Sequence, residues 1–143
     1  MSRPTDVRVT GAAVFMIPVR TRMPLKFGAQ VVDSVTCGRV AVEVEDAAGR
    51  RAVGWGETPL SVTWVWPSAL SYETRHAAMK EFCRRLATAW ANFASVGHPL
   101  EVGNDFLEHE LPKLLNEFNA ECGMRNAESP TTPHSALRTP HLS

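Results

Sequence analysis

The chain has 143 residues, room for one ordinary domain, and with 44% hydrophobic and 21% charged residues its composition is typical of a soluble globular protein. Fifteen basic and fifteen acidic residues give zero net charge, which argues against a nucleic-acid partner, since phosphates attract a concentrated basic face. The longest apolar run, 12–17, is far shorter than the ~20 residues that span a membrane, and the three cysteines (Cys37, Cys83, Cys122) fit neither a disulfide framework nor a zinc site. We therefore expect a cytoplasmic protein with reduced thiols and no membrane partner.

Three strands are predicted in the first 57 residues, at 7–20, 34–45 and 51–57. In the second, valines at 40, 42 and 44 alternate with Ala, Glu and Glu, which places the valines on one face. Gly11 interrupts the first strand and marks either a bulge or a close backbone approach. Residues 46–49 form a hairpin turn with Gly49 at the position that needs positive φ. Short connections then predict a three-stranded antiparallel meander.

Two segments between these elements have unusual compositions. The loop 21–30 mixes basic residues, Pro, Gly and apolar side chains, so it is either a functional loop or an irregular connection. The segment 58–68 holds two tryptophans between prolines without helical spacing. Those tryptophans belong either to the core or to a surface that faces a ligand.

Two helices follow. Ser71 is a good N-cap for a helix that runs to about Ala94, and its apolar stripe should dock on the valine face of the sheet. The second helix begins near Asn104 or Asp105 and extends to Phe118, and Pro112 predicts a kink or break at 108–111. The fold class is therefore α+β, a three-stranded meander followed by a small helical bundle. Residues 1–120 form the domain and 121–143, rich in Pro, Ser and Thr, form a disordered tail.

No set of residues with catalytic spacing is present in the sequence. The five histidines include no His-Glu-x-x-His pair, the glycines form no phosphate-binding loop, and no serine lies in Gly-x-Ser-x-Gly. We assign no catalytic or metal-binding residue.

The order of these motifs resembles one known domain. The loop Pro24-Leu25-Lys26-Phe27-Gly28, the valine strand, the turn at 46–49 and the strand end Gly54-Trp55-Gly56-Glu57 are similar to the N-terminal capping domain of the enolase superfamily, in the mandelate racemase and muconate lactonizing enzyme branch. The resemblance covers roughly Val7 to Phe118.

The resemblance implies an α+β cap over the mouth of a (β/α)-barrel. In that family the barrel holds Mg²⁺ and the bases that remove a proton α to a carboxylate. Two loops of the cap close over the substrate, and by position these are 23–30 and 58–68, which should lie together at one edge of the meander. The substrate-loop candidates are Leu25, Lys26, Phe27, Gly28, Trp64 and Trp66.

A barrel needs about 200–250 residues, whereas 25 remain after Phe118 (143 less 118). The metal ligands and bases therefore have no place in this chain, which needs no cofactor of its own. We expect a truncated or split cap, inactive alone, whose partner is the barrel domain if that is supplied separately. The alternative is a standalone α+β module whose Leu25, Phe27, Trp64 and Trp66 bind a small ligand, a protein partner or a second copy.

Overall fold

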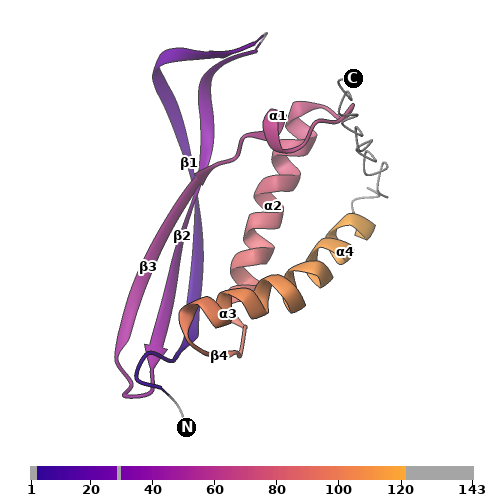
Figure 1. The fold of residues 1–143 in the computed structure, drawn as a ribbon. Helices are drawn as coiled ribbons and strands as arrows, with labels where there is room; N and C mark the ends of the chain where they lie inside the picture. The colour runs from indigo at the N-terminus through magenta and orange to yellow at the C-terminus, as the bar shows by residue number, and fades with distance from the viewer. Residues whose placement is uncertain (1–2, 29, 122–143) are drawn as a thin grey trace, which may run out of the picture.

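The computed structural model describes residues 3–28 and 30–121, in which helices lie on one side of an antiparallel sheet (Figure 1). The strands are β1 (Val7–Phe27), β2 (Gln30–Asp46), β3 (Arg51–Pro59) and β4 (Val96–Gly97). Their order is β3-β2-β1-β4, and every neighbouring pair is antiparallel. The α+β class is as predicted, but the sheet has four strands rather than three, because Val96 and Gly97 pair with the start of β1.

The turn between β2 and β3 forms where the sequence predicts it. The Asp46 carboxylate accepts hydrogen bonds from the backbone N–H groups of Ala48 and Arg50, both at 2.9 Å, and Gly49 has φ of +78°. An Asp side chain that binds its own turn and a glycine in the left-handed region together close a tight connection. The turn is therefore specified locally.

The predicted loop at 21–30 is wrong: most of it is strand. β1 continues to Phe27 and β2 begins at Gln30, with Gly28 at the tip at φ of +59°. Arg20 pairs with Ser34, whereas Leu25 pairs with Val32, so β1 has more residues than β2 between these two pairs. Pro24, which has no N–H to donate to a neighbouring strand, lies in this unpaired stretch. This irregularity bends the end of the hairpin into an arm, residues 21–34, seen at the top of Figure 1.

A second irregularity lies near the start of β1. Val9 pairs with Val44, but Gly11 pairs with Glu43, so Thr10 is the extra residue of a bulge. The bulge keeps Val9 on the valine face and sends the later odd-numbered residues of β1, such as Phe15, to the opposite face. Gly11 was the predicted bulge site, and the register confirms it.

The first long helix, α2 (Tyr72–Ala91), covers the valine face. The Ser71 hydroxyl accepts from the Thr74 N–H at 3.1 Å, which confirms the N-cap, and the helix ends three residues before the predicted Ala94. On β1 the side chains of Val14 and Met16 are half-buried, whereas that of Phe15 between them is exposed. Because Val14 pairs with Val40, α2 packs on the valine side of β1 and β2.

The remaining helices form a nearly continuous rod. α3 (Pro99–Asp105) starts earlier than predicted because His98 and Glu101 make a capping box, and it continues through the π-helix η1 (Phe106–Glu110) into α4 (Leu111–Glu121). The Leu111 N–H donates to the Phe106 carbonyl five residues earlier, so the expected kink at 108–111 takes the form of a π-turn just before Pro112. Glu121, placed in the tail by the sequence, ends α4, and the rest of the predicted tail lies outside the described residues.

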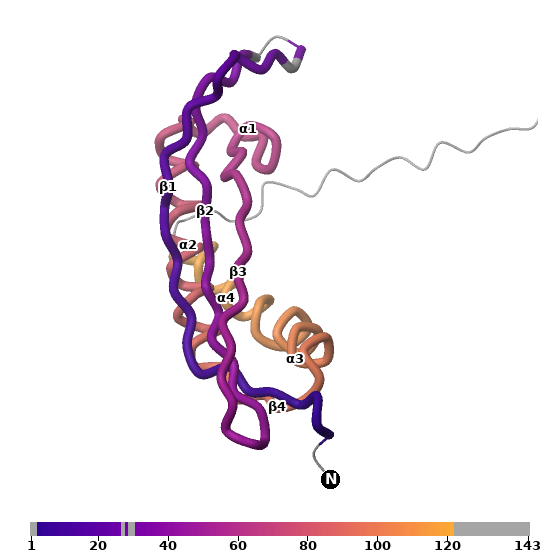
Figure 2. The backbone as a smooth tube through the Cα atoms, turned by 90° about the vertical axis from the view of Figure 1, so that its left-hand side faces the viewer, coloured from indigo at the N-terminus to yellow at the C-terminus, as the bar shows by residue number. Residues whose placement is uncertain are grey.

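The best-buried side chains lie between these helices and beside the short helix α1 (Val62–Val65). Phe106 stacks on Trp90 with ring centroids 4.0 Å apart and meets Phe93 edge-on, and both Phe106 and Val62 are 1% exposed. In contrast, every residue of β3 is exposed. Figure 2, turned by 90°, views the sheet from the side that carries no helix.

Candidate functional site

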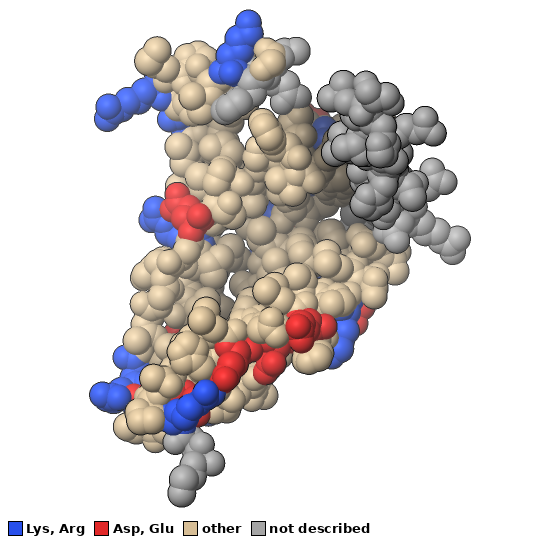
Figure 3. All heavy atoms as spheres, in the orientation of Figure 1, with Lys and Arg blue, Asp and Glu red and all other residues tan. Residues whose placement is uncertain are grey.

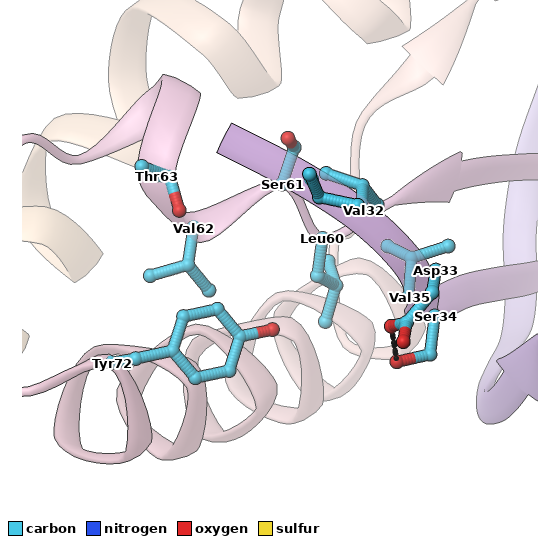
Figure 4. A pocket seen from close by; sticks show the side chains of 10 residues that line it. Val32, Asp33, Ser34, Val35, Leu60, Ser61, Val62, Thr63 and Tyr72 are labelled. Carbon is cyan, nitrogen blue, oxygen red and sulfur yellow. Dashed lines mark hydrogen bonds between the residues drawn. The ribbon is translucent and has the colours of Figure 1, made fainter. Parts of the chain in front are cut away.

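A hollow of about 390 Å³ lies where the arm leaves the sheet, between β2 and the chain that leads into α1 (Figure 4). Valines of β2 face Leu60, Val62 and the ring of Tyr72, whose hydroxyl end lies toward Leu60. The walls come from two chain segments and the first residue of α2: Val31, Val32, Asp33, Ser34, Val35, Leu60, Ser61, Val62, Thr63 and Tyr72.

Leu60 fixes one wall of the hollow to the sheet. Its N–H donates to the Thr36 carbonyl at 2.8 Å, and only 4% of the residue is exposed. A Cβ atom at Gly38 would lie 3.6 Å from the Leu60 side chain, which is an ordinary van der Waals distance, so Leu60 packs directly over this part of β2. The chain then turns into α1, where the Ser61 carbonyl accepts from Trp64 and Val65.

Arg75 holds α1 in place from α2. Its guanidinium donates to the backbone carbonyls of Trp66 at 2.5 Å and Ser71 at 3.3 Å, and the residue is buried. A buried guanidinium is stable only with such partners, so α1 and the start of α2 form one positioned unit.

The walls of the hollow also carry polar groups that can form hydrogen bonds with a ligand. The Ser34 hydroxyl donates to the Asp33 carboxylate at 3.0 Å, and hydroxyls of Ser61, Thr63 and Tyr72 also line the walls. Behind Tyr72, the His76 ring stacks on it at 5.5 Å, and burial, followed by the charge of Lys80, lowers the His76 pKa. Across the described residues no group of three or more His, Cys, Asp or Glu side chains could hold a metal ion.

The predicted site residues lie at this end of the molecule, and those whose side chains the structure describes do not line the hollow. Leu25 and Lys26 are exposed on the arm, paired with Val32 and Val31, Gly28 is its tip, and the backbone of Phe27 pairs with that of Gln30. Trp64 is 68% exposed on α1, and Trp66 is half-buried beside Arg75.

The side chains that form the walls were missed because their composition is that of ordinary strand and core residues. Val31 and Val32 precede the predicted second strand, and Tyr72 lies in the first turn of the predicted helix that Ser71 caps. The adjacent β-branched pair Val31-Val32 is typical of a strand, and that signal could have extended β2 to Gln30.

The arm also carries unbalanced charge. Figure 3 shows Lys and Arg side chains gathered on it. Arg22 and Lys26 of the arm and Arg20 just before it are exposed, and within the described part of the chain none of the three forms a salt bridge, unlike Arg8, Arg39 and Arg51. Asp33 is the only acidic residue between 20 and 34.

Comparison of the chain with protein-family models, with curated proteins and with solved structures finds no match. In residues 3–28 and 30–121, no helix has the length and apolar character needed to cross a membrane.

Proposed function

We propose that this chain serves as the capping domain of a mandelate racemase or muconate lactonizing type of enzyme, which abstracts a proton α to a carboxylate. Its role is to shape access and specificity, while the metal and the bases belong to a barrel domain. The support comes from the resemblance of the motif order and from one observation of the fold.

That observation is that two segments far apart in the sequence lie at the same hollow. The resemblance assigns 23–30 and 58–68 to the substrate, and about thirty residues separate them in sequence. Residues 60–63 of the second line the hollow, and the opposite wall is the part of β2 that pairs with Leu25 and Lys26 of the first. The strand order β3-β2-β1, followed by helices on one face, also supports a meander-and-helix cap.

The charge of the arm agrees with this role. A carboxylate substrate is attracted by exposed cations that have no acidic partner, and such fields raise the rate of encounter. Arg20, Arg22 and Lys26 supply that field at the edge of the hollow, because Arg20 pairs with Ser34, one of its wall residues.

The test is complementation in trans. The chain is added to the isolated barrel domain of an enzyme of that branch, and exchange of the α-proton in D₂O is followed by NMR across a panel of carboxylates. We expect exchange only when both parts are present, and a lower kcat/KM for Lys26→Ala than for Lys113→Ala, an exposed lysine on α4. Exchange by the chain alone, or no complementation with any barrel, would contradict the proposal.

The second candidate is a standalone module that binds a small ligand. The exposed Trp64 on α1, next to a hollow whose walls carry both apolar side chains and hydroxyl groups, favours it. Tryptophan fluorescence measured across a metabolite panel would change on binding. An unchanged spectrum, together with complementation of a barrel, would exclude the standalone module and leave the capping role as the supported function.

A further inference from the structure

The sheet face turned away from the helices, here called the outer face, has an apolar centre. Ala13, Ala41 and Trp55 form one cross-strand row, so their side chains point the same way. Phe15 and Val53 lie on the same face in the neighbouring rows. Phe15, Val53 and Trp55 are 48%, 52% and 64% exposed, so three large apolar side chains from adjacent rows meet the solvent together on this face.

The two aromatic rings make one platform across the sheet. Phe15 belongs to β1 and Trp55 to β3, and their rings stack with centroids 6.1 Å apart over the intervening β2. Ala41 of β2 pairs with Trp55, and its small side chain leaves room for the indole to reach Phe15 in the next row. Beside Trp55 lies a hollow of about 360 Å³, lined by Arg39, Trp55, Gly56 and Glu57, which is large enough to receive a side chain of a second molecule.

Ion pairs border this centre at both ends. At one end Glu45 accepts from Arg8 at 2.6 Å and from Arg51 at 2.9 Å, and at the other Arg39 contacts Glu57 at 2.6 Å. An apolar centre with a polar rim, rich in aromatic and Arg residues, is the anatomy of a protein interface.

The charges of the outer face select a second copy of this chain as the partner. The outer face carries as many cations as anions, so it does not repel an identical face. The cations are Arg8, Arg39 and Arg51, and the anions are Glu43, Glu45 and Glu57. The arm, in contrast, carries unpaired cations and would repel its copy. We infer that two chains pack outer face to outer face about a two-fold axis, with each Trp55 near the centre.

The available area suits a weak, reversible dimer. Three strands about 4.8 Å apart lie side by side over the nine residues of β3, and at about 3.3 Å per residue they present roughly 430 Å² of flat surface. Stable complexes bury about 800 Å² per partner, so the dimer should form only at micromolar or higher concentrations. Aligned sheets approach to ~10 Å, which the small residues Ala13 and Ala41 permit.

Sedimentation equilibrium of the full chain over a concentration series tests this inference. The average mass should rise from 15.7 kDa toward twice that value. Trp55→Ser should raise the dissociation constant about tenfold or more, since a central tryptophan is a typical hot spot, and Phe15→Ser should act in the same direction. Trp64→Ser is the matched control, because it removes an equally exposed tryptophan from the other end of the molecule and should leave the dissociation constant unchanged.

Three results would overturn it. The first is a chain that stays monomeric at concentrations up to about 1 mM, because a dissociation constant above that value would mean that the outer faces have no specific affinity for each other. The second is dissociation by Trp64→Ser but not by Trp55→Ser, which would move the contact to the arm end. The third is a chain that is monomeric alone and binds a separate barrel domain through Trp55, which would give the face to that partner. Far-UV circular dichroism checks that each variant is folded.

Discussion

Phe106 should be the most sensitive position in the domain. It is 1% exposed, it stacks face-on with Trp90 at 4.0 Å and 13°, and it meets the edge of Phe93 at 5.2 Å. Its backbone carbonyl also accepts the π-turn hydrogen bond from Leu111. This one side chain therefore joins α2 to the rod formed by α3, η1 and α4.

Phe106→Ala should lower the free energy of unfolding by about 3–5 kcal/mol, the usual result of removing a fully buried ring and leaving a cavity. A domain of this size has about 5–15 kcal/mol in total, so the variant would keep only part of its stability. With a urea slope of about 2 kcal/mol/M, the midpoint should fall by roughly 2 M. Urea titration followed by far-UV circular dichroism, at a concentration that keeps the chain monomeric, measures this directly.

Leu107→Ala is the matched control. The residue is adjacent in η1 but 59% exposed, and its loss should change the stability by about 0.5 kcal/mol or less. A loss below about 1 kcal/mol for Phe106→Ala, or equal losses for both variants, would refute the assigned packing of the rod on α2.

Three further outcomes are expected. Gly49→Ala should destabilise the domain by about 1–2 kcal/mol in thermal unfolding because φ is +78° there, whereas Gly54→Ala, with open space around it, should cost little. Arg75→Met should cost about 1–3 kcal/mol and speed hydrogen exchange around α1, since the Trp66 carbonyl loses its donor, whereas the Ser71 carbonyl keeps the backbone N–H of residue 75. Hydrogen bonds from arginines hold the Glu45 pKa below its ordinary 4.5, so its contribution is present above that pH and lost as the pH falls. Glu45→Gln should therefore lower Tm at neutral pH and have no effect near pH 2.

Each of these has a result that contradicts it. Equal costs for both glycine variants would mean that the turn does not require positive φ. Unchanged exchange around α1 in Arg75→Met would mean that other contacts hold the helix. A Glu45→Gln variant with the same deficit in Tm at acid and neutral pH would show that its effect is not electrostatic.

Several features of the fold were predictable because a few neighbouring residues determine them. Asp46 and Gly49 close their turn through bonds within five residues, and Ser71 caps α2 through Thr74 three residues on. Pro112 cannot donate a backbone hydrogen bond, so an irregular turn before it was expected. The α+β class follows equally from the change of hydrophobic period from two to about 3.6.

The hollow was not predictable in the same way. Leu60, Val62 and Tyr72 look like ordinary apolar residues in sequence, and only the bond from Leu60 to Thr36 and the guanidinium of Arg75 bring them opposite Val32. The motif order indicated that two segments would lie together at one edge, but it named residues on the arm and α1 rather than those of the walls.

By itself, then, the sequence determined the turn at 46–49, the N-cap of α2, the class of fold and the absence of a recognisable catalytic motif, since these depend on short-range geometry and composition. Tertiary structure alone decided that 21–27 belongs to a strand, because its pairing with β2 overrides the turn preference of Pro24. It also decided which sheet face stays open. The bulge at Thr10 sends Phe15 to the face of Trp55, and α2 covers the opposite side.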